Sequence, residues 1–393
     1  MDKSLIQIPP NDCCGCFACV NACPKGAISM NSDKEGFLYP RINQSLCVHC
    51  NLCTKACPVI NDCQRNTPYF ENAFAAFIRD ENIRKQSSSG GVFSALAKGV
   101  LKNNGIVFGA TLDKEDVSKC VFVGIDDTND LPLLQGSKYV QAEIGYAYKS
   151  AKSYLQEGRM VLFSGTPCQI AGLYSYLKGN KFDNLFTVDV VCHGVVSPLV
   201  YKKYLHFVEN ENSSKKIQTV SFRNKISGWR NYSMSIKFSD GSEISSLNTN
   251  DLYMRAFLSN ISARKSCSSC KYSRIPRVAD ISLGDFWGVK HIHPELNDDK
   301  GVSLVSVNNE HGKSLWNVIS ESLDSKRTSL KKALVFSPHF YSSCKPNQKR
   351  DEFFKHIDDV PFNKLIEKFC PRIGFLEKNL KKIKKFILLL RNS

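Results

Sequence analysis

The sequence lacks any segment that would take the chain into or across a membrane. The N-terminus, MDKSLIQIPPND, has no apolar h-region of a secretory signal, and no run approaches the roughly 18 apolar residues of a membrane span. Two common nucleotide motifs are also missing: no G-x-G-x-x-G follows a strand pattern, and no G-x-x-x-x-G-K-[ST] occurs. We therefore expect a cytoplasmic protein without a Rossmann fingerprint or a P-loop.

Acidic residues are in short supply, with 37 Asp and Glu against 53 Lys and Arg, so that the formal net charge is +16. The excess is uneven, because residues 379–391 (NLKKIKKFILLLR) hold five cations and no acid. No base-reading motif accompanies this charge, so we do not expect nucleic-acid binding. An acidic protein partner, an anionic cofactor or a membrane surface fits the charge instead.

The composition is otherwise that of a globular protein. At 393 residues and 42% hydrophobic content, the chain can form two or three domains with a large core. Its 17 cysteines could indicate a secreted disulfide framework. Their spacing argues against this, because thiolates at metal-ligand intervals need a reducing compartment.

Two cysteine runs dominate the N-terminal part. CCGCFACVNACP covers residues 13–24 and CVHCNLCTKACP covers residues 47–58, each with the spacing C-x-x-C-x-x-C-x-x-x-C-P. This is the spacing of bacterial two-cluster ferredoxins, in which the fourth cysteine of each run binds the other cluster. Structural zinc is the alternative, but zinc sites usually group cysteines in pairs.

The interleaving rule assigns eight cysteines to two [4Fe-4S] clusters. Cys14 is an additional thiol that we interpret as a packing residue rather than a ligand. We call the predicted ligands set I (Cys13, Cys16, Cys19 and Cys57) and set II (Cys47, Cys50, Cys53 and Cys23).

From residue 72 onward the pattern alternates between strands and helices. Buried strands are predicted at 73–78, 106–112, 120–125, 160–163 and 185–191, with helices at 92–101 and 144–156 and another ending at Leu177. Further along, strands at 220–222 and 232–238 are followed by a hairpin turn at 239–242, and 252–258 and 312–323 are helical patterns. Such alternation favours an α/β sheet with helices on its faces.

Four further cysteines are scattered over this region. Cys168 and Cys192 each follow a predicted strand, and Cys267 and Cys270 form a C-x-x-C pair. If the two strands are neighbours in one sheet, their carboxyl ends place both thiols at the edge where open α/β sheets bind ligands. A third metal site is one interpretation. A structural zinc, a redox disulfide or unrelated buried cysteines are the others.

Three turns of small residues are typical of anion binding. On these residues alone helix caps and simple turns are the favoured interpretation, but backbone N–H groups before a helix also attract phosphate. Lys138 would add a point charge to one of these turns. The residues are Ser88, Ser89, Gly90 and Gly91; Gly136, Ser137 and Lys138; and Gly165 and Thr166.

Three other features have two interpretations each. Asp285, beside Phe286 and Trp287, could border a flavin ring or order a loop. His193, in a glycine turn, could donate to a cofactor or serve only the turn. The tail residues Leu376, Leu380, Ile383, Ile387 and Leu390 fall on one helical face, which could pack on its own domain, touch a membrane surface or dock a partner.

Taken in order, these motifs resemble a known family. After the ferredoxin runs come SSSGGVFSAL, QGSKYVQ, SGTPCQIAGL, VVCHGV, SFRNKISGW, CSSCKY and ADISLGDFWG, which together resemble the coenzyme F-420 hydrogenase/dehydrogenase beta-subunit family from about residue 13 to about residue 350. The resemblance implies an FAD-binding domain and a third [4Fe-4S] cluster. It implies that the third cluster is held by Cys168, Cys192, Cys267 and Cys270. It also implies flavin contacts at Ser88 to Gly91, Gly136 to Tyr139, Gly165, Thr166 and His193, with Asp285 as a further candidate.

The resemblance completes the expected fold and function. The expected fold class is α+β / α/β, with a dicluster ferredoxin domain over 1–65, an FAD/iron–sulfur domain with a mixed sheet over 70–345, split into 70–150 and 155–345, and a basic helical tail over 346–393. The expected function is an iron–sulfur flavin-dependent oxidoreductase that acts on an F-420-like deazaflavin or another small, planar molecule. Its partner would be a ferredoxin or a catalytic subunit. The alternative is a non-catalytic electron-transfer subunit that docks a partner enzyme. No catalytic residue is assigned.

Overall fold

The computed structural model describes residues 9, 11–61, 72–178 and 180–372 of the chain. The polar stretch 61–69 is predicted from the sequence to be a linker, and its residues 62–69 lie outside the described residues. So does the tail from residue 373, including the predicted helical face that runs from Leu376 to Leu390.

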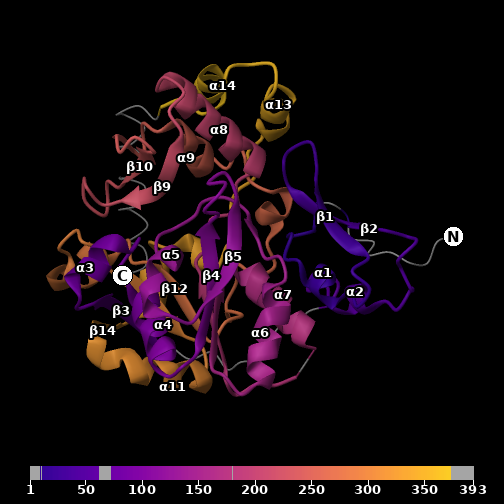
Figure 1. Ribbon diagram of the computed structural model, residues 1–393. Helices are drawn as coiled ribbons and strands as arrows, with labels where there is room; N and C mark the ends of the chain where they lie inside the picture. The colour runs from indigo at the N-terminus through magenta and orange to yellow at the C-terminus, as the bar shows by residue number, and fades with distance from the viewer. Residues whose placement is uncertain (1–8, 10, 62–71, 179, 373–393) are drawn as a thin grey trace.

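The N-terminal module has the small ferredoxin-like fold expected from the cysteine runs. Its two strands, β1 (Ile28–Ser32) and β2 (Leu38–Ile42), pair antiparallel, with Ile28 opposite Ile42. Two short helices carry the cysteine runs: α1 (Ala18–Ala22) and α2 (Leu52–Lys55). In Figure 1 this module lies at one side of the molecule, beside the large sheet.

The body of the protein is built on a nine-stranded mixed sheet in the order β14-β3-β13-β12-β8-β7-β4-β5-β6. Its four central strands, β12, β8, β7 and β4, are parallel, and the flanking pairs β12–β13 and β4–β5 are antiparallel. The strands are β3 (Asn72–Ile78), β4 (Ile106–Leu112), β5 (Cys120–Ile125), β6 (Ala142–Glu143), β7 (Val161–Gly165), β8 (Leu185–Val190), β12 (Ile281–Asp285), β13 (Ser303–Val307) and β14 (Leu323–Thr328).

Helices cover both faces of this sheet. Along β7, Leu162 packs in one core with α4 and α11, whereas Val161 and Phe163 pack in another with α6 and α7. This alternation follows from the period of two in a strand. The helices are α3 (Glu81–Gln86), α4 (Val92–Lys102), α5 (Leu131–Leu134), α6 (Ala147–Gln156), α7 (Pro167–Leu177), α10 (Val289–Ile292), α11 (Glu310–Ile319) and α12 (Leu330–Leu334).

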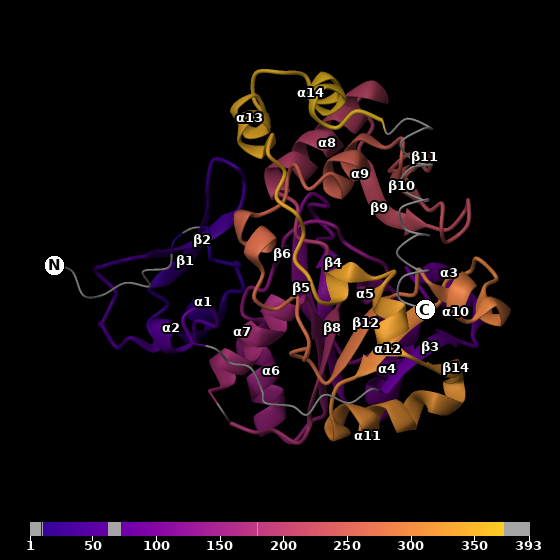
Figure 2. The ribbon, with the colours of Figure 1, turned by 180° about the vertical axis from the view of Figure 1, so that it is seen from behind.

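A second folded region, whose apolar core we call the second core, lies above one end of the sheet (Figure 2). It combines an antiparallel sheet in the order β11-β10-β9 with helices that come from two distant parts of the chain. The elements are α8 (Pro198–Glu211), β9 (Ile217–Asn224), β10 (Ser233–Phe238), β11 (Glu243–Leu247), α9 (Leu252–Leu258), α13 (Arg350–Lys355) and α14 (Phe362–Phe369).

Strands from both predicted parts of the second domain, 70–150 and 155–345, share the nine-stranded sheet, so the two parts belong to one folded unit. Residues 346–372 do not form a separate tail, because Phe353, Leu365 and Ile366 are buried in the second core against α8 and α9. Apolar burial that spans more than a hundred residues leaves no local signal in the sequence.

Two strands of the large sheet, one at its edge and one in its centre, were not predicted from the sequence. The predicted helix 312–323 ends at Ile319, and Leu323 instead begins the edge strand β14. Ile281–Asp285, interpreted only as a motif, is the central strand β12. Its serine and glycine residues mask the sequence pattern of a strand, because small residues are used there to let neighbouring strands pack closely. No helix in the described part of the chain is long and apolar enough to cross a membrane.

Candidate iron–sulfur and cofactor site

The structure brings each of the two interleaved cysteine sets together. One pocket of the N-terminal module is lined by all four cysteines of set I, and a second pocket is lined by all four cysteines of set II. The fourth cysteine of each run therefore lies with the first three of the other run, as ferredoxin interleaving requires.

The local backbone repeats between the two runs. Gly15 and Phe17 flank Cys16 with φ of 66° and 63°, and His49 and Asn51 flank Cys50 with φ of 53° and 57°. The left-handed region is uncommon for residues other than glycine, and it concentrates at functional sites. Here it turns the chain on either side of the second cysteine so that the thiols of one run face a common space.

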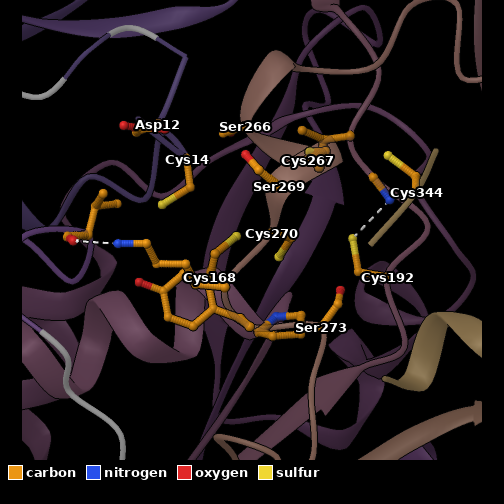
Figure 3. A pocket seen from close by; sticks show the side chains of 16 residues that line it. Asp12, Cys14, Cys168, Cys192, Ser266, Cys267, Ser269, Cys270, Ser273 and Cys344 are labelled. Carbon is orange, nitrogen blue, oxygen red and sulfur yellow. Dashed lines mark hydrogen bonds between the residues drawn. The ribbon is translucent and has the colours of Figure 1, made fainter. Parts of the chain in front are cut away.

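A third pocket lies at the edge of the large sheet. Cys168 follows β7 and Cys192 follows β8, and these strands are parallel neighbours with Gly165 opposite Asp189. The C-x-x-C pair of Cys267 and Cys270 lies on the segment that faces this edge. The four scattered cysteines thus line one pocket, although they span 103 positions in the sequence (Figure 3).

Two further thiols line this third pocket. Cys14 comes from the N-terminal module, and Cys344 comes from the segment after α12 (Figure 3). Two of the predicted ligands have polar contacts to their sulfurs: Thr166 Oγ1 lies 3.2 Å from Cys168 Sγ, and the Gly194 N–H donates to Cys192 Sγ at 3.4 Å. The pocket therefore offers six thiols, two more than a cubane binds.

The third pocket adjoins the pocket of set I. Cys14 and Val59 line both pockets. The approach of the module to the body is also close at α7, where a side chain at Gly172 would place its Cβ 3.1 Å from Cys16 Sγ and 2.9 Å from Tyr148 Oη. Glycine at this helical position lets α7 pass directly beside a set I cysteine.

Polar contacts hold the module against the body. The buried Arg264 donates through Nε to the Cys13 carbonyl at 2.7 Å and through Nη2 to the Leu38 carbonyl at 3.0 Å. Tyr272 Oη donates to the Pro58 carbonyl at 2.7 Å. The module also shares an apolar core with α6 and α7, so it is an integral part of the fold rather than a tethered domain.

The thiols fit iron–sulfur clusters in their chemistry. Burial, with the charge of neighbouring cysteines, raises the pKa of Cys19, Cys57 and Cys267, and it raises the pKa of Cys192 to about 12. Crowded thiols of this kind stay neutral unless a cation compensates their charge, and bound iron would supply it. No three His, Cys, Asp or Glu side chains in the described ranges gather closely enough to hold a single metal ion. A cubane instead binds its ligands at separate corners.

The predicted flavin contacts separate into groups. In the first group, the Ser137 N–H donates to Ser88 Oγ at 2.7 Å, which joins two of the three small-residue turns. Gly90 is pressed against strands, because a Cβ there would lie 2.3 Å from the Ala76 carbonyl oxygen. Lys225 Nζ donates to the Ser89 carbonyl at 2.7 Å. These turns thus meet beside the Lys225 amine, whose pKa burial lowers to about 7, while Gly90 itself serves packing.

Lys138 has partners within its own turn. Its Nζ donates to the carbonyls of Leu133 at 3.0 Å and Gln135 at 2.7 Å. Burial lowers its pKa to about 8, because the charged ammonium loses hydration. Its charge is therefore directed at backbone carbonyls, and Gly136, with φ of 78°, forms the open turn around it.

Gly165 and Thr166 belong to the rim of the third pocket. They end β7 and begin α7, where the Thr166 N–H donates to Gln169 Oε1 at 2.8 Å. This is a capping box, which explains the Gly-Thr-Pro turn without a ligand. It also places Thr166 Oγ1 beside Cys168.

A row of rings connects the third pocket with the turns around Ser137. His193, next to Cys192, packs on Phe257 with a ring-centre distance of 4.9 Å, and Phe257 stacks on Tyr139 at 4.4 Å. His193 Nδ1 lies 3.0 Å from His339 Nε2. Burial lowers the pKa of His193 to about 4, so the imidazole is neutral near pH 7.

Asp285 ends β12 at the same sheet edge as the cysteines. It accepts from Trp229 Nε1 at 3.1 Å and forms an ion pair with the buried Arg223. Nε and Nη2 of Arg223 are buried and have no hydrogen-bond partner within the described part of the chain. Buried polar atoms of this kind need an explanation, and a bound polar molecule would supply one. The site therefore fits a cofactor with hydrogen-bond acceptors near Arg223.

Sequence reasoning missed three residues of this site. Arg223 lies within the SFRNKISGW motif, and Arg264 lies three positions before Cys267, so both were close to recognised signals. Cys344 has no partner at metal-ligand spacing, and only the folded chain places it beside Gly194 and Cys267.

Family models match three successive parts of the chain. Two family models of the coenzyme F420 hydrogenase/dehydrogenase beta subunit match, one for its N-terminal part at residues 73–148 and one for its C-terminal part at residues 158–331. Residues 12–61 match a 4Fe-4S dicluster domain. Among solved structures, a chain of the F420-reducing [NiFe] hydrogenase complex from Methanosarcina barkeri, from a xenon derivatization, is 17% identical. The match covers 77% of this chain and 93% of that chain, with a TM-score of 0.46. A search of curated proteins gave no match.

Proposed function

Because this chain belongs to the coenzyme F420 hydrogenase/dehydrogenase beta-subunit family, we propose that it is an iron–sulfur flavoprotein oxidoreductase. It passes electrons between [4Fe-4S] clusters and a small or planar substrate beside FAD. An F-420-like deazaflavin is the substrate class that the family name favours.

One observation carries this proposal. The third pocket and the pocket of set I share Cys14 and Val59, so thiol-lined spaces continue from the N-terminal module to the edge of the large sheet. From there the rings of His193, Phe257 and Tyr139 lead to the buried Arg223 and to its ion-pair partner Asp285. A site for one-electron carriers and a site for an organic cofactor thus adjoin in one fold.

The residues of the chain have distinct parts in this function. Cys50 of set II is exposed and lines the same pocket as the exposed Val48, so this end is open to a redox protein such as a ferredoxin or a catalytic subunit. Set I and the four predicted ligands in the third pocket are more enclosed, because each of their thiols is buried or only partly exposed. Arg223 and Trp229 position Asp285 at the sheet edge.

The cofactors would supply the redox chemistry when bound. Clusters exchange single electrons and a flavin takes up two, so together they couple a one-electron partner to a two-electron substrate. The chain contributes the spacing of the sites, the hydrogen bonds to the ligand sulfurs and the exclusion of water.

Cofactor counting under anaerobic conditions tests the proposal. The protein should contain about twelve iron atoms, about twelve sulfides and one FAD, which corresponds to three cubanes and one flavin. About eight iron atoms with one zinc and no flavin would contradict it. Mixing the isolated protein with reduced F-420 then separates an enzyme from an electron-transfer subunit, because only an enzyme reduces its own flavin rapidly without a partner.

A further inference from the structure

Cys14 occupies a place that the cluster assignments leave unused. It follows the set I cysteine Cys13 and is not part of the C-x-x-C-x-x-C-x-x-x-C-P spacing. Its side chain lines both the set I pocket and the third pocket. In Figure 3 it enters the third pocket from the loop of the N-terminal module, on the side away from Cys192 and Cys344.

The Cys14 thiol lies between two sets of predicted ligands. It lines the set I pocket together with Cys16, and it lines the third pocket together with Cys168. A thiol has one weak S–H donor, whose hydrogen can turn to either neighbouring ligand sulfur. One side chain therefore faces a predicted ligand of each of two neighbouring sites.

The surroundings hold Cys14 in this position. A Cβ at the next residue, Gly15, would lie 2.3 Å from Gln141 Nε2 and 3.1 Å from Arg264 Nη1, so the loop is pressed onto the body. Arg264 Nε holds the preceding carbonyl, that of Cys13, at 2.7 Å. Thr166 Oγ1 lies 3.2 Å from the sulfur of Cys168.

Hydrogen bonds to ligand sulfurs are one of the ways in which a protein sets the reduction potential of an iron–sulfur cluster. A donor to a ligand sulfur stabilises the reduced cluster, which carries one more negative charge. Most such donors are backbone N–H groups that act on one cluster alone, as the Ala27 N–H does on Cys23 Sγ at 3.2 Å.

We propose that Cys14 is a positioning residue that bridges the set I site and the third site, so that the reduction potentials of both depend on its thiol. It is not a ligand of either cluster. This inference rests on the proposed function in one respect, because it needs a cluster in the third pocket.

The experiment compares wild type, Cys14→Ala and Cys14→Ser, purified anaerobically. Cys370→Ala is the matched control, because Cys370 is a buried thiol whose neighbour is Ser259 and which lines none of the three cysteine pockets. Iron is counted first, and the [4Fe-4S] signals are then followed by electron paramagnetic resonance during a redox titration. About eight iron atoms in wild type would overturn the third cluster of the proposed function before any variant is considered.

With about twelve iron atoms in wild type, Cys14→Ala should keep all twelve and lower two of the three potentials. The third potential, that of the set II cluster, should stay unchanged. Cys14→Ser should return both potentials to wild type or above, because its hydroxyl is a stronger donor than a thiol. Cys370→Ala should change none.

Three results would overturn the inference. A loss of about four iron atoms in Cys14→Ala would make Cys14 a ligand. Unchanged potentials in Cys14→Ala would leave it only a space-filling role, and a shift of a single potential would remove the bridge. If Cys14→Ala does not fold, Cys14→Ser alone tests the inference. Reduction potentials below the wild-type values in Cys14→Ser would contradict a bridging role of Cys14.

Discussion

Replacing Arg350 with methionine should loosen the attachment of the N-terminal module. Arg350 lies in α13, and its guanidinium forms a bidentate pair with Glu35, in the loop between β1 and β2. Both side chains are buried, at 8% and 6% exposure, and Arg350 Nε also donates to the Ala263 carbonyl at 2.7 Å. The variant would leave a buried carboxylate without its main partner.

The size of the effect follows from this burial. Removing one partner of a buried ion pair costs about 3–5 kcal/mol, because the other charge stays behind without compensation. Lys265 Nζ, 4.0 Å from Glu35 Oε1 and partly exposed, can take over some of the pairing, so we expect the lower end, about 3 kcal/mol. At about 2.1 cal/mol/K per residue, a chain of 393 residues has an unfolding entropy of about 0.8 kcal/mol/K. The melting temperature should therefore fall by about 4 °C.

Anaerobic thermal unfolding measures this, followed by the iron–sulfur absorbance and by circular dichroism. The control is the double variant Glu35→Leu/Arg350→Met, which removes both charges and should recover most of the loss. Iron content should stay at the wild-type value in both, because neither residue lines a cysteine pocket. A decrease below about 1 °C in Arg350→Met, or a double variant less stable than Arg350→Met, would refute the reasoning.

Three further changes test other parts of the structure. Cys267→Ser should remove about four iron atoms and leave about eight in an iron analysis, with Cys370→Ser as the control. Retention of all twelve iron atoms would contradict the assignment of Cys267 as a ligand of a third cluster. Gly172→Ala should lower the melting temperature by about 1–3 °C, because the cost of displacing Cys16 and Tyr148 exceeds the gain in helix propensity. The control Ser150→Ala, on the exposed face of α6, should leave the melting temperature unchanged. An unchanged or higher melting temperature for Gly172→Ala would show that the module can shift freely. For Lys138, whose pKa falls from 10.5 to about 8 on folding, the unfolded chain binds more protons between these values, so stability rises with pH through that window. Wild type should thus gain about 2 °C over Lys138→Met between pH 7.5 and 9.5, and a constant difference would contradict the lowered pKa.

Local patterns in the sequence predict the cysteine sites better than the domain boundaries. The spacing of the two runs is enough to pair Cys57 with the first run and Cys23 with the second, and the structure brings these thiols together. The strand ends at Cys168 and Cys192 likewise predict a shared sheet edge, which the parallel pairing of β7 and β8 provides. In each case the signal lies within a few residues of the cysteine concerned.

Other parts of the site depend on contacts between distant segments. Cys344 reaches the third pocket, and α13 and α14 reach the second core, only after the chain between them has folded. The small-residue turns show the reverse problem. Ser88, Gly90, Thr166 and Lys138 have the composition of an anion site, but hydrogen bonds within the protein and close strand packing use several of them. Their part in flavin binding stays a prediction.

The apolar core that the N-terminal module shares with α6 and α7 limits how such proteins can be recombined. Phe17 and Val20 of the module pack in one apolar cluster with Tyr148, Ile170 and Tyr174 of the body. The module and the body therefore share one core. A ferredoxin from another source, grafted onto this body, would carry the cysteine spacing but a foreign packing face. A chimaera therefore needs the matching faces of both helices, and the unit that is inherited or engineered is the module together with α6 and α7.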